Sequence, residues 1–263
     1  MFRPTDNTSL ENQVNTHQVQ YERDGYTIYR NVLDTDLLAE IQGHIDWSRV
    51  KLKVQGPGPF AVHDAFFARL VSDPRLLSIA ETYIGAHIGL YSSHYLIKEP
   101  EVGLPILWHQ DLGYWPLEPQ AVVTLYLAID PASPENGCMR VIPGSHKVLR
   151  DHAESGDRPN VFGKELVLSE EEQSRAVDIV LEPGDVEVHH PFIIHGSSAN
   201  TSSIRRAALP MRYIPTSTSI LGETRACTWL LQGESQGARH EWSLWPSYDS
   251  HSDFPFRGCE NWR

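Results

Sequence analysis

The sequence predicts a mainly β fold, an antiparallel sandwich or jelly roll, with helices on its flank. Short runs rich in β-branched and aromatic residues recur from residue 88 onward, and clusters of Pro, Gly, Ser and Asp separate them. Helical patterns, in contrast, are concentrated before residue 86. Such short strands with turn-forming residues between them are typical of two packed antiparallel sheets. No repeat or linker divides the 263 residues, so we expect a single domain.

The predicted helical flank covers residues 10–86 and follows a tail, residues 1–9, that we expect to be disordered. Gly25 should end the first helix, because glycine readily adopts the left-handed conformation of a helix end. Thr35 or Asp36 is the expected N-cap of the next helix, whose apolar residues recur at helical spacing. The predicted elements are a helix over 10–24, a strand over 26–30, a helix from about residue 35, and helices over 63–70 and 73–83.

The predicted jelly-roll core covers residues 87–215, and residues 216–263 form a C-terminal extension. Within the core, residues 151–175 are polar and irregular, which predicts a surface insertion or lid. The predicted strands of the core cover residues 88–97, 122–129, 139–142, 176–181, 186–188, 192–195 and 207–214.

Composition narrows the possible partners. The chain carries 22 basic and 34 acidic residues, a formal net charge of −12. Nucleic acids and anionic membranes bind clustered Lys and Arg, so we expect neither as a partner. Three cysteines without C-x-x-C spacing predict reduced thiols. With no apolar signal segment and no apolar stretch of about 18 residues, we expect a soluble cytoplasmic protein.

One motif, Trp108-His109-Gln110-Asp111, indicates a metal site. In an extended strand residues two apart project to the same face, so His109 and Asp111 would offer a nitrogen and an oxygen to one point. They would be two of the three ligands of a 2-His-1-carboxylate facial triad, which holds Fe(II) and leaves positions open. With 13 His and 34 acidic residues in the chain, the motif alone is also compatible with a surface turn.

Three histidines compete for the third position. His195 follows the apolar run 192–194, which predicts that it lies at the inner end of a buried strand. His189 and His190 precede Pro191, which predicts a strand edge or a turn. The long separation from Asp111 is one that a jelly roll can close by returning the chain to the opposing sheet. The pattern favours His195 and leaves the other two open.

Two adjacent arginines, Arg205 and Arg206, begin a strand-like run. Alternation allows one of them to face inward and the other to face solvent. A buried guanidinium needs a partner, and a dicarboxylic cosubstrate would supply one through bidentate hydrogen bonds.

Taken together, these residues resemble the phytanoyl-CoA dioxygenase family of Fe(II)/2-oxoglutarate-dependent oxygenases. The matching stretches lie within residues 25–215 and are 53–55, 109–112, 136–147, 195–200 and Arg206. The resemblance implies a double-stranded β-helix, iron on His109, Asp111 and His195, and 2-oxoglutarate anchored by Arg206, with O2 as co-reactant. It also implies that the cosubstrate pocket is lined by Ser197, Gln110, Lys53, Tyr126 and Tyr95.

The implied reaction is hydroxylation of a small metabolite or natural-product intermediate, with release of succinate and CO2. Related halogenases carry a small residue where Asp111 stands, so the carboxylate favours hydroxylation. The alternative is a cupin-like metal-binding isomerase or a non-oxygenase binding module, which would have no use for Arg206. No catalytic residue is expected beyond the metal site. The candidate substrate residues, any of which could instead be core, are His63, Phe66, Tyr91, His94, Tyr114, Trp115 and Trp229.

Overall fold

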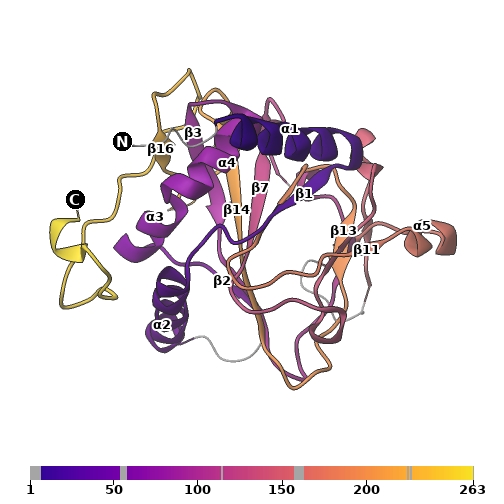
Figure 1. Cartoon of the computed structure of the whole chain (residues 1–263), viewed down its shortest axis with the longest axis horizontal. Helices are drawn as coiled ribbons and strands as arrows, with labels where there is room; N and C mark the ends of the chain where they lie inside the picture. The colour runs from indigo at the N-terminus through magenta and orange to yellow at the C-terminus, as the bar shows by residue number, and fades with distance from the viewer. Residues whose placement is uncertain are drawn as a thin grey trace.

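The computed structural model describes residues 7–53, 58–113, 115–156, 163–223, 225 and 227–262. Two antiparallel sheets face each other as a double-stranded β-helix, and the N-terminal helices cover the outer face of the larger sheet (Figure 1). This is the jelly roll that the sequence predicts. No helix of the described residues is long and apolar enough to cross a membrane.

Most helices begin and end close to the predicted positions. The first starts at Asn7, inside the predicted tail, and ends before Gly25, whose φ is 84°. The N-cap of the second is Asp34, whose carboxylate accepts a hydrogen bond from the Leu37 N–H, so the predicted caps lie one or two residues too late. The helices are α1 (Asn7–Asp24), α2 (Thr35–Leu52), α3 (Ala65–Val71), α4 (Pro74–Ile84) and α5 (Glu170–Ser174). The 3-10 turns are η1 (Asp111–Gly113), η2 (Pro134–Asn136), η3 (Ser145–Lys147) and η4 (Cys259–Asn261).

The larger sheet has the strand order β1-β12-β7-β14-β3-β16, and β4 extends it beside β14 with β2 at its edge. The predicted strand 88–97 breaks at His94 into two strands, both of which pair with β14. The strands are β1 (Tyr26–Tyr29), β2 (Gly58–Phe60), β3 (Ile88–Ser93), β4 (Tyr95–Lys98), β7 (Val123–Ala128), β12 (Val186–His189), β14 (Arg206–Pro215) and β16 (Leu230–Gln232).

The smaller sheet has the order β11-β8-β13-β5. Its strands are β5 (Ile106–His109), β8 (Met139–Val141), β11 (Val177–Asp178) and β13 (His195–Ser197). Two short ladders complete the structure, formed by β6 (Leu117–Glu118) with β15 (Ser219–Ile220) and by β9 (Ala153–Glu154) with β10 (Lys164–Glu165).

The predicted strand over residues 192–195 is wrong. Pro191 cannot donate to a ladder, and the Ile193 N–H bonds to the His190 carbonyl at 2.9 Å, so residues 191–194 form a turn. His195 is therefore the first residue of β13. It also pairs directly with His109 of β5, in the same sheet and not in the opposing one.

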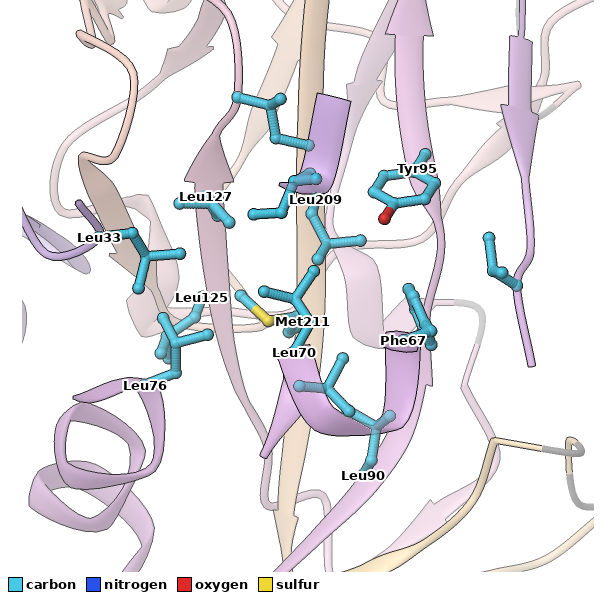
Figure 2. Packing of buried hydrophobic residues seen from close by; sticks show 14 of the residues in the cluster. Leu33, Phe67, Leu70, Leu76, Leu90, Tyr95, Leu125, Leu127, Leu209 and Met211 are labelled. Carbon is cyan, nitrogen blue, oxygen red and sulfur yellow. The ribbon is translucent and has the colours of Figure 1, made fainter. Parts of the chain in front are cut away.

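Strand alternation divides the side chains of the larger sheet between two environments. Leu125, Leu127, Leu209 and Met211 face the helices and pack against α3 and α4 (Figure 2). Their sequence neighbours face the smaller sheet, and several of them are polar. The interior between the sheets is thus where buried polar groups gather.

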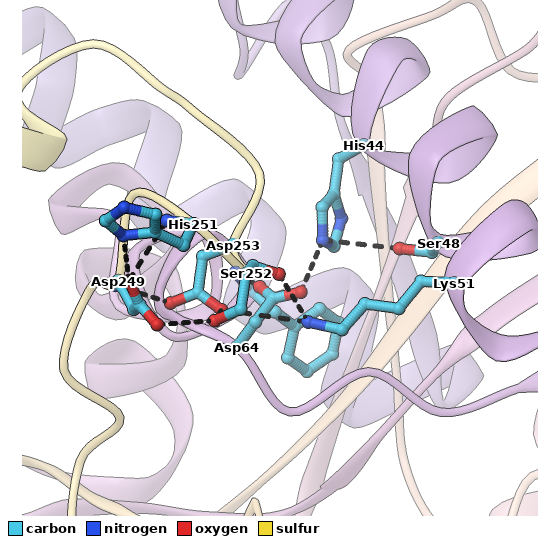
Figure 3. A network of polar contacts seen from close by, with 9 residues as sticks. His44, Ser48, Lys51, Asp64, Asp249, His251, Ser252 and Asp253 are labelled. Atoms are coloured by element: carbon cyan, nitrogen blue, oxygen red, sulfur yellow. Dashed lines mark hydrogen bonds and ion pairs between the residues drawn. The ribbon is translucent and has the colours of Figure 1, made fainter.

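The C-terminal extension packs against the helices. Phe254 contacts the rings of His44 and Phe66 with centroid distances of 5.3 Å each. Nearby, Lys51 of α2 donates to the carbonyl of Ser252 at 2.7 Å (Figure 3). The segment after β16 therefore covers the outer side of α2 and α3.

Candidate metal centre and cosubstrate cavity

The metal centre lies where β13 pairs with the edge strand β5 of the smaller sheet. His109 ends β5, His195 begins β13, and their ring centroids are 4.1 Å apart. Asp111 does not continue the strand as expected but begins η1, and this turn brings its carboxylate to the two imidazoles. One ligand atom from each residue lies within 4.8 Å of the other two, and all three residues are buried.

Hydrogen bonds orient both imidazoles toward a common point. The Nδ1 of His109 lies 2.8 Å from the Leu107 carbonyl, and the Nδ1 of His195 lies 3.1 Å from the Ile193 carbonyl. Because a carbonyl accepts, each Nδ1 carries the proton and each Nε2 presents its lone pair to the centre. Burial, and then the neighbouring His109, hold the pKa of His195 well below its ordinary value. A neutral imidazole is the form that binds a metal.

The carboxylate of Asp111 completes the donor set. Its Oδ1 lies 3.6 Å from the Nε2 of His109 and 3.9 Å from the Nε2 of His195. Burial alone would raise the pKa of Asp111, but the neighbouring His109 and His189 and the charge of Arg212 hold it well below its ordinary value. Two neutral imidazoles and one carboxylate on one side of a point fit a facial Fe(II) site.

A buried pair on β12 contacts the other oxygen of this carboxylate. The Nε2 of His189 lies 3.8 Å from Asp111 Oδ2, and its Nδ1 bonds to the carboxylate of Glu187 at 2.7 Å. Burial lowers the pKa of His189, but Glu187 and Asp111 outweigh it and raise the pKa to about 9. His189 lies on a strand paired on both sides, not at the predicted strand edge. The alternation of Glu187 and His189 along β12 is the sequence signal that could have identified this pair.

A cavity between the sheets extends from the metal centre to Arg206, the first residue of β14. Arg206 is 1% exposed, and its Nη1 donates to the hydroxyl of Tyr126. Its Nε and Nη2 have no hydrogen-bond partner among the residues that the structure describes, and neither has the Oγ of Ser197. Buried polar groups are normally paired, so these donors indicate a missing anionic partner at this end of the cavity.

Arg205 faces the opposite way, as alternation predicts. It is not a solvated residue, however, because its Nε bonds to Asp130 at 2.7 Å and its Nη2 donates to Gln42. Asp130 also accepts from the Ala207 N–H at 2.9 Å. The pair therefore anchors the start of β14.

Of the other residues expected around the cosubstrate, Tyr126 and Ser197 line the cavity and three do not. Gln110 is buried, but its amide bonds to the backbone of Val148, Phe192 and Arg150. Tyr95 faces the helices, where its hydroxyl bonds to His44 at 2.7 Å, because alternation turns Leu96 to the cavity instead. Lys53 is exposed at the end of α2.

The candidate substrate residues divide similarly. His94 and Trp115 line a second cavity beside the metal centre, and the ring of Tyr91 contacts Trp115 with a centroid distance of 5.4 Å. His63 lines a hollow next to this cavity. Phe66 and Trp229 lie in the helix-side core at 0% and 1% exposure, and Tyr114 lies outside the described residues. Two residues of the second cavity, Arg212 and Arg225, were not expected from the sequence.

Comparison with known sequences supports the assignment of the motifs. The family model of phytanoyl-CoA dioxygenase (PhyH) matches residues 21–208. L-proline trans-4-hydroxylase of Streptomyces griseoviridis is 30% identical over 227 residues, which cover 74% of this chain and 84% of that protein. A probable alpha-ketoglutarate-dependent hypophosphite dioxygenase of Stutzerimonas stutzeri is 31% identical over 147 residues, 55% of this chain and 51% of that protein. The chain thus matches about half the length of the latter relative.

Solved structures share the fold. The apo form of the non-heme monooxygenase ThoJ superposes with a TM-score of 0.71 at 24% identity and covers 92% of this chain and 91% of its own. EctD from S. alaskensis, in complex with 2-oxoglutarate and 5-hydroxyectoine, gives 0.66 at 20% identity and covers 90% and 88%. With a family model matching most of its length, the chain belongs to the phytanoyl-CoA dioxygenase (PhyH) family.

Proposed function

We propose that this protein is an Fe(II)/2-oxoglutarate-dependent dioxygenase that hydroxylates a small metabolite or natural-product intermediate and releases succinate and CO2. The observation that carries the proposal is the buried Arg206, with two unpartnered donor atoms, at the far end of a cavity that begins at the His-Asp-His cluster. A metal-binding isomerase or binding module would leave these donors unexplained.

His109, Asp111 and His195 would hold Fe(II) and leave coordination positions open on the cavity side. Bound iron and 2-oxoglutarate together supply the oxidising chemistry, in which O2 is consumed. The protein's part is to position these groups and the target C–H bond. Because Asp111 supplies a carboxylate, no ligand position is vacated for a halide.

The cavity supplies what a five-carbon dicarboxylate needs. Arg206 would bind the distal carboxylate through charge-assisted hydrogen bonds. Tyr126 accepts from Arg206, so its own hydroxyl proton is available to the same carboxylate, as is that of Ser197. Leu96, Ile106 and Met139 line the walls and would exclude water around the carbon chain.

Relatives support the reaction class. The names of two of them describe an alpha-ketoglutarate-dependent dioxygenase and an amino-acid hydroxylase, both acting on small molecules. As part of the proposal we place the protein in the cytoplasm, because all three cysteines, Cys138, Cys227 and Cys259, are free thiols.

A spectroscopic titration tests the proposal without knowledge of the substrate. Anaerobic addition of 2-oxoglutarate to the Fe(II) protein should produce a metal-to-ligand charge-transfer band that is absent with Fe(II) alone. Under air, the same complex should form succinate slowly. A protein that binds Fe(II) but shows neither the band nor succinate would be the isomerase or binding module.

A further inference from the structure

The second cavity beside the metal centre has a volume of about 220 Å³ and carries two arginines. Arg212, on β14, is 8% exposed, and its guanidinium lies 5.5 Å from the ring centre of Trp115. Arg225 lies at the rim, with its guanidinium 5.5 Å from the ring centre of Tyr91. The two aromatic rings contact each other, so they hold both guanidiniums at one cavity.

The described residues offer these two guanidiniums a single carboxylate. In the described part of the chain, Asp111 is the one carboxylate within 4 Å of the Arg212 guanidinium, with Nε and Oδ2 3.9 Å apart, and Arg225 forms no ion pair. The Nε of Arg212 also lacks a hydrogen-bond partner within the described ranges. Once Asp111 binds a metal, its charge is shared with the cation, and the buried guanidinium of Arg212 needs another partner.

The other titratable groups at this cavity add no negative charge. Burial, and then the charges of Arg212 and Arg225, lower the pKa of His94 to about 3, so it is neutral near pH 7. Burial raises the pKa of Tyr91, so its hydroxyl is protonated. The cavity therefore combines a positive field with aromatic walls.

We propose that this cavity binds the substrate by an anionic group, a carboxylate or a phosphorus oxyanion held between Arg212 and Arg225, next to the metal centre. The proposal rests on the dioxygenase function and names the substrate class. The volume of this second cavity lies below the ~300–1,000 Å³ of typical drug-sized sites, so the part of the substrate beside the metal centre is small. A neighbouring hollow of about 470 Å³, which shares His94 and Arg225 and reaches His63, can hold the rest of the molecule.

The main alternative is that Arg212 and Arg225 bind 2-oxoglutarate and not the substrate. Arg212 also lines the cosubstrate cavity, so it does not separate the two possibilities. Arg225 lines the second cavity and its outer hollow, but is absent from the lining of the cosubstrate cavity. Arg225→Gln is therefore the informative variant, and Arg239→Gln is its matched control, because Arg239 is an exposed arginine paired with Glu118.

The test is anion binding to the anaerobic Fe(II)–2-oxoglutarate complex at low ionic strength, with acetate and inorganic phosphate as probes and acetamide as the neutral comparison. Binding is followed by tryptophan fluorescence and calorimetry. We expect at least one anion to bind in the millimolar range or tighter and acetamide at least tenfold more weakly. Arg225→Gln should weaken anion binding about tenfold, whereas Arg239→Gln should leave the anion affinity within twofold of that of the parent protein.

Three outcomes overturn the proposal: neither anion binds, acetamide binds equally well, or Arg225→Gln leaves anion binding unchanged. A probe that competes with 2-oxoglutarate would assign the arginines to the cosubstrate and also overturn it. The relative affinity of acetate and phosphate then separates the two anion classes. Failure of the dioxygenase function is distinguishable, because it would appear earlier as a missing charge-transfer band with 2-oxoglutarate.

Discussion

A single side chain at the start of β14, that of Arg206, distinguishes a 2-oxoglutarate-dependent dioxygenase from a metal-binding isomerase or binding module. Arg205 and Arg206 are neighbours, yet one bonds to Asp130 on the helix side and the other enters the cavity. Burial makes the inward arginine sensitive to its partner, because an unpaired buried charge is costly. Function at this scale therefore depends on which face a residue takes.

Arg206→Ala should raise the 2-oxoglutarate concentration needed for half-maximal succinate formation by at least tenfold. Removing one partner of a buried charged pair costs about 2–5 kcal/mol, and each ~1.4 kcal/mol is tenfold in affinity. Arg205→Ala should leave this concentration nearly unchanged, but it should lower the melting temperature because Asp130 loses its partner. If Arg205→Ala is instead the variant that weakens 2-oxoglutarate binding, the residues assigned to the two faces of β14 must be exchanged.

His195 and His189, which both lie near Asp111, should behave differently when replaced. His195→Ala removes a ligand and should abolish stoichiometric Fe(II) binding. His189→Ala should still bind one Fe(II) per chain, but with about tenfold lower affinity. Replacing a residue that orients a ligand typically lowers metal affinity 10–100-fold. Anaerobic Fe(II) titration of both apo variants measures this. Iron retained by His195→Ala and lost by His189→Ala would exchange the two assignments.

Among the elements, the turn between β12 and β13 has the largest consequence for the site. It replaces the predicted strand over 192–195 and places His195 opposite His109. His190 lies in this turn, where its Nδ1 accepts a hydrogen bond from the Phe192 N–H at 3.1 Å. A half-buried, neutral histidine thus stabilises the segment that delivers a metal ligand.

This turn should make the protein sensitive to acid. Burial, and then the nearby charges of His146, His189 and Lys147, lower the pKa of His190 to about 4. In the unfolded chain its pKa is about 6.5. Between these values the unfolded state binds the proton more readily, so stability is present above pH 6.5 and falls as the pH falls through 4. Melting temperatures from pH 7 to pH 4 should drop less in His190→Gln than in the parent protein. Parallel curves would exclude His190 as a contributor.

At the scale of the whole molecule, the segment after β16, residues 233–262, supports the helices and lines neither cavity beside the metal centre. Phe254 packs against Phe66 and His44, and the Cζ of Phe254 would lie 3.1 Å from a Cβ placed on Gly43 of α2. None of the residues lining the cosubstrate cavity comes from this segment. Replacements in this segment should therefore change the stability of the protein without changing the metal site.

Phe254→Ala should lower the free energy of unfolding by about 1–3 kcal/mol, less than the ~3–5 kcal/mol of a fully buried Phe, because Phe254 is only partly buried. Urea unfolding measures this loss. Leu244→Ala is the control, since Leu244 is 92% exposed and should change stability little. Fe(II) affinity should stay the same in both. A large loss of Fe(II) binding in folded Phe254→Ala would show coupling between the segment and the site.

The sequence by itself determined the features that depend on local chemistry. Turn residues and β-branched runs indicated the jelly roll, and period-two alternation separated Arg205 from Arg206. The H-x-D motif identified two members of the metal cluster, and the resemblance selected His195 from three candidates. All but the choice of His195 follow from neighbours a few residues away, and that choice rests on the order and spacing of the motifs.

Tertiary structure decided what depends on pairing between distant segments. Alternation says which residues share a face but not which strands lie side by side, so Tyr95 and Gln110 were expected in a cavity that neither enters. The alternation of Glu187 and His189 is visible in the sequence, but the position of His189 next to Asp111 was not predicted, and neither was that of Arg212 and Arg225 beside the metal centre. Their positions are set by long-range strand pairing and by the packing of loops over the sheet, which no local pattern encodes.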